Sequence, residues 1–137
     1  MNKLLLTLLL VVSSSVFAAG STNPEVTQET IKTTICKTGW AAKIRPPSSY
    51  TTSLKKKQLA SIGIKKEDYP KYVEDHIIPL SVGGNPRDEA NLAPQLFADS
   101  KKKDVYENSV HKSICKGTVS LAEGQLVFTS GSWQSNK

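Results

Sequence analysis

The chain has 137 residues, with 18 Lys and Arg against 12 Asp and Glu, so its formal charge is +6. A chain of this length forms one domain with a modest core and leaves no room for a second domain of ordinary size. The moderate positive charge permits a polyanionic partner but does not establish one.

The first 18 residues predict a secretory signal peptide. Lys3 supplies the positive start, residues 4–12 are almost wholly apolar, and small residues lead to Ala18. The apolar run is too short to cross a membrane comfortably, so an uncleaved anchor is the less favoured alternative. We expect cleavage after Ala18 or the next residue. The remaining domain, residues 19–137, has 17 Lys and Arg against 12 Asp and Glu, or 17 − 12 = +5. The pattern predicts an exported protein, periplasmic or secreted, with no stable membrane anchor after cleavage.

The beginning of this domain shows little regular patterning. Residues 21–29 are polar and predict a linker or a loosely packed arm. Residues 33–40 predict a short extended piece that ends at Gly39, and both Trp40 and Trp133 are expected in the core. The prolines within residues 45–47 favour an extended conformation.

The middle of the chain predicts a helix followed by a strand. Residues 49–61 show helical spacing of apolar residues, with a cap among residues 51–53 and Gly63 placed to end the helix. Residues 72–80 are rich in Val and Ile and predict a strand. Residues 82–95 contain a glycine turn and a return segment that the pattern does not assign.

Two helices are predicted towards the C-terminus. Residues 99–115 form the clearest one, and Gly117 is placed to end it. Residues 118–128 predict a second helix, in which Ser120 and Glu123 have the spacing of a capping box.

The two cysteines, Cys36 and Cys115, both lie in the exported part of the chain. An even number of cysteines in an oxidising compartment favours one disulfide over two free thiols. The bridge would close a loop of 115 − 36 = 79 positions, which corresponds to roughly 4 kcal/mol in the chain-entropy model. Two cysteines without a CxxC pair or clustered histidines do not predict a zinc site.

The residue pair with the clearest chemical meaning is Asp75 and His76, at the end of the β-branched run. A carboxylate can hold a hard divalent cation, and an imidazole can take a proton from water near neutral pH. Together these groups suit phosphodiester hydrolysis. An isolated Asp-His pair is more often merely solvated, so the residues around the pair decide the interpretation.

The surrounding pattern resembles the HNH nucleases, also called His-Me finger or ββα-metal nucleases. Residues 75–80 are followed by the pair Gly83-Gly84 and, fifteen positions after His76, by Asn91. Further segments are similar to a small group of exported HNH-like proteins over nearly the whole domain: residues 34–36, 45–47, 91–92, 103–104, 107–108 and 115–117. The resemblance implies a small α+β domain with a ββα-metal core, additional helices and one disulfide.

The resemblance also implies roles for individual residues. Asp75 matches a metal ligand, His76 matches the general base, and Asn91 matches the asparagine that steadies the catalytic loop. The implied cofactor is a divalent metal ion, Mg²⁺ in the first place, with Mn²⁺ or Zn²⁺ as alternatives.

The last metal ligand of the family departs from the usual pattern. A His or Asn is expected about nine residues after Asn91, and that position falls on Ser100, with Asp99 beside it. We take Asp99 as the candidate ligand, while Ser100, Asp104 and Gln95 remain open. The Cys36–Cys115 bridge would replace the zinc-ribbon cysteines that often support such folds.

Basic residues offer contacts for a phosphate backbone. Arg45 and Lys103 are the candidates for binding a flanking phosphate. The runs at residues 55–57, 65–66 and 101–103 are individually ordinary solvated charges, and they would form a phosphate track only if the fold brought them to one face.

The sequence therefore predicts an exported, metal-dependent endonuclease that hydrolyses DNA or RNA with little sequence specificity, since no segment resembles a base-reading module. The alternative is a non-catalytic protein on a degenerate HNH finger, binding nucleic acid or an envelope partner. The oligomeric state is open, with a monomer as the default expectation.

Overall fold

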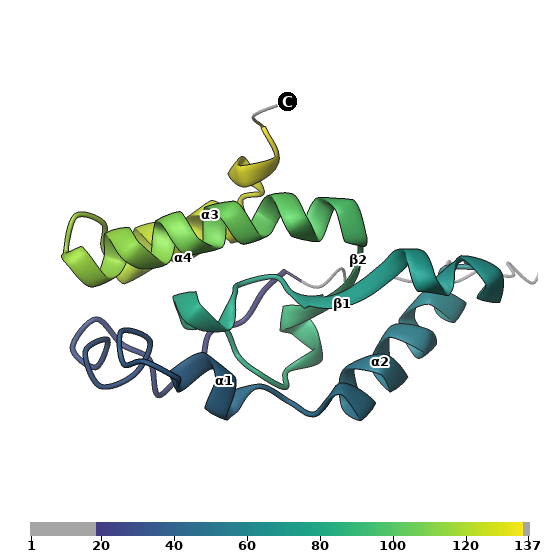
Figure 1. Cartoon of the computed structure of the whole chain (residues 1–137), viewed down its shortest axis with the longest axis horizontal. Helices are drawn as coiled ribbons and strands as arrows, with labels where there is room; N and C mark the ends of the chain where they lie inside the picture. The colour runs from purple at the N-terminus through teal and green to yellow at the C-terminus, as the bar shows by residue number, and fades with distance from the viewer. Residues whose placement is uncertain (1–18, 136–137) are drawn as a thin grey trace, which may run out of the picture.

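A computed structural model describes residues 19–135 (Figure 1). The predicted signal peptide lies outside the described residues. The helices and strands in chain order are α1 (Trp40–Ile44), α2 (Ser48–Ser61), β1 (Tyr72–His76), β2 (Leu92–Leu96), α3 (Phe97–Lys116) and α4 (Leu121–Thr129). Short 3-10 helices span Lys66–Lys71, Leu80–Val82, Glu89–Asn91 and Ser132–Gln134.

The strands β1 and β2 form an antiparallel hairpin in which Asp75 pairs with Ala93 and His76 pairs with Leu92. The helix α2 packs against both strands, and α3 follows β2 directly and crosses the hairpin from the other side (Figure 1). This mixture of helices and a small sheet agrees with the predicted α+β class. The order strand, strand, helix places the end of β1 next to α3.

The strand predicted over residues 72–80 is shorter in the structure, because β1 ends at His76. The next backbone N–H, that of Ile77, still reaches the carbonyl of Asn91 (2.8 Å). After that the chain turns at Pro79 and folds back on itself at Gly84. A Cβ atom on Gly84 would lie 1.8 Å from the carbonyl oxygen of Ile78, so only glycine allows this close approach.

The helix ends follow local signals to different degrees. The predicted helix over residues 49–61 is present as α2, but its N-cap is Pro47 and no side chain caps it. The helix α3 begins two residues before its predicted start and ends at Gly117, whose φ is 78°. The capping box predicted for α4 is confirmed, with Ser120 and Glu123 bonding reciprocally.

Two predictions for the beginning of the domain are wrong. Residues 28–36 form consecutive turns, where an extended piece was expected for residues 33–40. Residues 21–23, predicted to belong to a linker or loose arm, run beside the loop that follows β1. Thr22 forms a bridge with Gly84, and the N–H of Asn23 donates to the carbonyl of Gly83 (2.8 Å).

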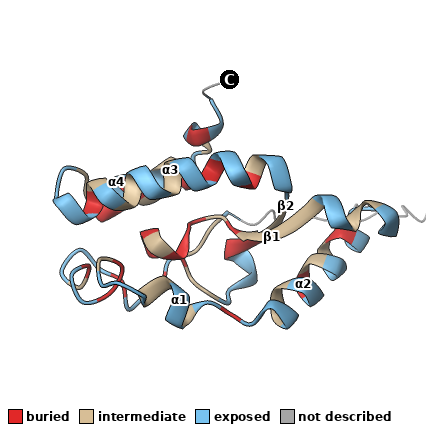
Figure 2. Ribbon diagram, in the orientation of Figure 1, coloured by how far each residue is buried: buried red, intermediate tan, exposed pale blue. Residues whose placement is uncertain are grey.

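The main core joins segments that are distant in the sequence. Figure 2 shows buried residues in the loop after β1 and on α3 and α4, while much of the helix surface is exposed. The buried members of the main core are Val26, Ile31, Ile35, Ile78, Val82, Ile114, Leu121, Phe128 and Trp133. Trp133 is in this core as predicted, and Trp40 packs against it. The predicted disulfide between Cys36 and Cys115 is confirmed, and it ties the N-terminal turns to the end of α3 with a Cα–Cα distance of 5.6 Å.

Candidate functional site

A polar cavity of about 240 Å³ lies where the end of β1 faces α3. Asp75 and His76 line it from β1, and Arg45 lines it from the extended segment before α2. The remaining lining residues are Pro79, Leu80, Asp104, Glu107 and Asn108. The structure therefore brings three of the residues predicted from the sequence, Asp75, His76 and Arg45, to one cavity.

His76 is buried, with 5% of its surface exposed, and its ring is held by the backbone. The Nε2 atom lies 3.0 Å from the carbonyl oxygen of Pro86. A carbonyl oxygen can only accept a hydrogen bond, so Nε2 carries the proton in the neutral ring and Nδ1 keeps its lone pair. Burial lowers the pKa of His76 below its ordinary value, and the positive charges of Arg45 and Lys103 act in the same direction. The imidazole is thus held neutral, with one nitrogen able to accept a proton.

Asp75 is held by two donors beside this histidine. Its Oδ1 accepts the backbone N–H of His76 (2.9 Å), and its Oδ2 lies 3.1 Å from the ammonium of Lys103. Lys103 also donates to the backbone carbonyl of His76. The sequence suggested Lys103 as a contact for a flanking phosphate. The structure places this side chain inside the protein, 3% exposed, where it binds both residues of the Asp-His pair.

Asn91 is completely buried and holds the loop between the strands. Its Oδ1 accepts the N–H of Ile78 (2.9 Å) and the N–H of Ser21 (3.3 Å). Its Nδ2 donates to the carbonyls of Ile78 (3.0 Å) and Asn85 (2.9 Å). These bonds hold the backbone of the loop just beyond His76. Asn91 is not among the residues that line the cavity.

The candidates for the last metal ligand separate in space. Asp99 lies in the first turn of α3, where its Oδ1 is 3.9 Å from Nζ of Lys102. It does not line the cavity of His76. Ser100 donates its hydroxyl to the carbonyl of Phe97 (2.9 Å). Gln95 lines a different cavity, and Asp104 alone among the four shares the cavity of Asp75 and His76.

Glu107 and Asn108 also line this cavity, and the sequence reasoning assigned neither of them a role. The available signal was helical spacing, because positions 104, 107 and 108 are three or four residues apart and share a face of α3. Burial raises the pKa of Glu107, and the negative charges of Asp75 and Asp104 raise it further, while a hydrogen bond from Ser81 (2.8 Å) opposes them.

The donors in this cavity suit a hard cation in kind. Carboxylates from Asp75, Asp104 and Glu107 and the amide of Asn108 offer oxygen, which Mg²⁺ and Mn²⁺ prefer. Within residues 19–135 no three His, Cys, Asp or Glu side chains are already arranged as a metal site. Mg²⁺ usually keeps several water ligands and takes only one or two carboxylates from the protein. Asp75 together with Glu107 or Asn108 would hold it.

Several lysines of the basic runs have partners within the described chain. Lys55 donates to the carbonyl of Tyr72 (2.8 Å), and Lys57 lies 3.7 Å from Glu89. Lys101 pairs with Asp104 (3.4 Å). Arg45 is exposed and lines the cavity, so it is the better placed of the two predicted phosphate contacts.

Glu74, the residue before Asp75, is a buried carboxylate that the sequence did not mark. Neither of its oxygens has a hydrogen-bond partner within the described chain, and it lines a cavity of about 220 Å³ with Thr51, Thr52 and Lys55. Burial raises the pKa of Glu74 to about 7, although the charge of Lys55 acts in the opposite direction. The folded protein therefore holds this proton more tightly than the unfolded chain does.

The raised pKa of Glu74 predicts that the free energy of unfolding decreases as the pH rises. The contribution of Glu74 to the free energy of unfolding is fully present below pH 4.5, the pKa of this group in the unfolded chain. It is lost as the pH rises through about 7, the pKa in the folded protein. Glu74→Gln stays neutral, so we expect its free energy of unfolding at pH 8 to exceed that of the parent by about 1–3 kcal/mol, with little difference at pH 4. Urea unfolding at both pH values measures this. The exposed Glu67→Gln serves as the control, and an equal effect of both substitutions would contradict the assignment.

Comparison of the chain with protein-family models, with curated proteins and with solved structures found no match in any of the three. No helix within the described residues is both long and apolar enough to cross a membrane. The disulfide is consistent with a periplasmic or extracellular location.

Proposed function

We propose that the protein is an exported, metal-dependent endonuclease that hydrolyses phosphodiester bonds of DNA or RNA with little sequence specificity. The observation that carries the proposal is the geometry of His76. Its Nε2 is bound to the carbonyl of Pro86, so Nδ1 is the ring nitrogen left to accept a proton, and His76 lines a cavity together with Asp75 and Arg45. This is the arrangement that a general base for water requires.

The chemistry follows from the positions of these side chains. His76 Nδ1 takes a proton from a water molecule, and the resulting hydroxide attacks phosphorus in line with the leaving oxygen. The P–O bond to that oxygen breaks, and the leaving oxygen takes a proton from a solvent water molecule, so the products are one phosphate end and one hydroxyl end. Arg45 binds a non-bridging phosphate oxygen at the open side of the cavity. A bound divalent ion would supply neutralisation of the charge that develops on the phosphate.

Lys103 is a positioning residue in this scheme. It binds both the Asp75 carboxylate and the carbonyl of His76, so it fixes the two residues relative to α3. Each carboxylate oxygen can accept more than one bond, so the contact with Lys103 leaves Asp75 able to serve as a ligand.

The same contact favours the second candidate function, a non-catalytic nucleic-acid or envelope-partner binding protein. The ammonium of Lys103 already neutralises Asp75, as the metal would in an enzyme. Cleavage of a supercoiled plasmid by the purified protein, with and without divalent metal, separates the two functions.

A further inference from the structure

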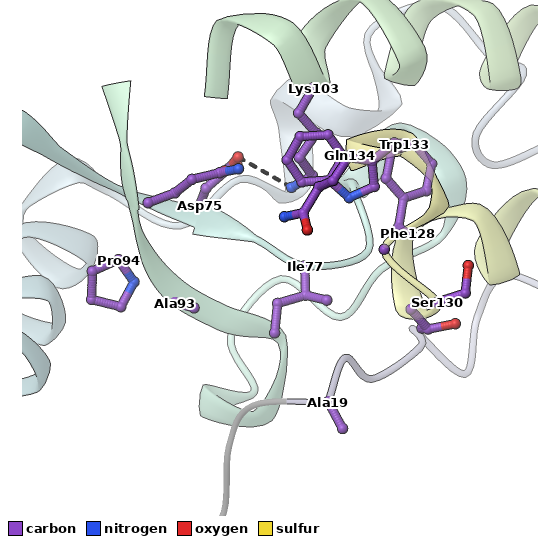
Figure 3. Close-up of a pocket in the computed structure, with 13 residues that line it drawn as sticks. Ala19, Asp75, Ile77, Ala93, Pro94, Lys103, Phe128, Ser130, Trp133 and Gln134 are labelled. Carbon is purple, nitrogen blue, oxygen red and sulfur yellow. Dashed lines mark hydrogen bonds and ion pairs between the residues drawn. The ribbon is translucent and has the colours of Figure 1, made fainter. Parts of the chain in front are cut away.

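A second cavity, of about 380 Å³, adjoins the candidate site and has no part in the chemistry above. Asp75 lines both cavities, so the two cavities share this residue. Figure 3 shows Ala93, Pro94 and Ile77 contributed by the hairpin and its loop, Lys103 by α3, and Phe128 and Trp133 by the C-terminal part of the chain. A substrate bound at His76 would therefore extend towards this second cavity.

The charges in this cavity cancel, which limits the kind of ligand it can take. Its lining contains one cation, Lys103, and one anion, Asp75, and the two form an ion pair with 3.1 Å between Nζ and Oδ2 (Figure 3). A phosphate would meet a carboxylate as well as an ammonium here. The cavity is better suited to a neutral group.

The rest of the lining suits a planar group with polar edges. Ile77, Ala93 and Pro94 present apolar surface, and Trp133 adds an aromatic ring. Gln95 and Gln134 also line the cavity, and neither carboxamide makes a hydrogen bond within the described chain. A carboxamide both donates and accepts hydrogen bonds, so these groups can pair with the edge of a heterocycle.

From this lining we infer that the second cavity binds one unpaired nucleobase, that of the nucleotide next to the phosphodiester held at His76. The inference rests on the proposed function and makes single-stranded nucleic acid, or a base turned out of its duplex, the substrate class. A base within a duplex is paired and stacked, so it cannot enter a cavity without being extruded.

Binding can be measured without cleavage through the fluorescence of Trp133. The chain has two tryptophans, and Trp40→Phe leaves Trp133 as the only one. Trp40 tolerates this change because its Nε1 is buried without a hydrogen-bond partner within the described chain. The probe is an eight-nucleotide single-stranded oligothymidylate in EDTA, compared with its duplex with oligoadenylate. We expect saturable quenching by the single strand and at least about tenfold weaker binding of the duplex.

Two variants in this background test the location of the base. Ala93→Phe fills the cavity, and Gln95→Ala combined with Gln134→Ala removes both free carboxamides while leaving the apolar lining intact. We expect each to weaken single-strand binding about tenfold. Val105→Phe adds the same ring at a position 67% exposed and outside the lining of the cavity, and it should bind as the parent does.

The outcomes separate this inference from the proposed function. If the carboxamide variant binds the single strand as tightly as the parent, or if the duplex binds equally well, the base site is refuted even for a protein that cleaves. If the single strand binds as expected and no metal supports cleavage, the nuclease proposal is refuted and the base site stands.

Discussion

Replacement of His76 by Gln should reduce the rate of phosphodiester cleavage by about 10²–10⁴-fold, the range that general-base catalysis typically contributes. Glutamine keeps an N–H that can donate to the Pro86 carbonyl, but it has no nitrogen that takes a proton. It is a better test than alanine, because His76 is buried and its complete removal would also leave an empty space beside the hairpin. The initial rate of plasmid nicking measures the effect.

The other histidine of the chain provides a matched control. His111 Nε2 also lies near a backbone carbonyl, that of Ile35 (2.9 Å), and this side chain lies by the disulfide rather than in the cavity of His76. His111→Gln should therefore cleave at the parent rate. A folded His76→Gln protein as active as the His111→Gln protein would show that His76 is not the base.

Loss of the Cys36–Cys115 bond should destabilise the protein by roughly 4 kcal/mol, because the bond closes a loop of 79 positions in the unfolded chain. This is a large share of the 5–15 kcal/mol that small domains possess. The bond also holds the N-terminal turns, which contribute Ile31 and Ile35 to the core, against the end of α3. For a domain of this size we expect the melting temperature to fall by roughly 10–20 °C.

The measurement compares thermal unfolding of the oxidised protein with that of the reduced protein and of a Cys36→Ala, Cys115→Ala variant. Alkylation and mass spectrometry establish how many cysteines are free in each sample. The reduced protein and the double variant should melt close together. An unchanged melting temperature in fully reduced protein would show that the disulfide does not stabilise the folded protein.

Local signals made parts of the fold predictable from the sequence. The capping box at Ser120 and the glycine after α3 act within a few residues, so they specify the ends of α4 and α3 without help from distant segments. The resemblance carried by Asp75, His76 and Asn91 implied two strands followed by a helix, and the structure contains an antiparallel hairpin followed by α3.

Contacts between distant segments were not predictable in this way. Lys103 occurs in a run of three lysines and looks like a solvated charge, yet α3 carries it to Asp75, 28 positions earlier in the chain. The polar residues 21–23 looked like part of a loose arm, but the loop after β1 offers them backbone partners. Asp99 was favoured as a ligand by counting from Asn91, whereas the rotation of α3 brings Asp104, Glu107 and Asn108 to the cavity instead.

The most direct test of the nuclease proposal is a plasmid-nicking assay with the purified, oxidised protein. The assay uses supercoiled DNA and a parallel RNA substrate, with Mg²⁺, Mn²⁺ or Zn²⁺ added in turn and with EDTA. We predict cleavage of at least one substrate in Mg²⁺ or Mn²⁺, none in EDTA, and its loss in the His76→Gln variant. Absence of cleavage under every metal, from protein whose disulfide and folding have been verified, would contradict the proposal and favour the binding function.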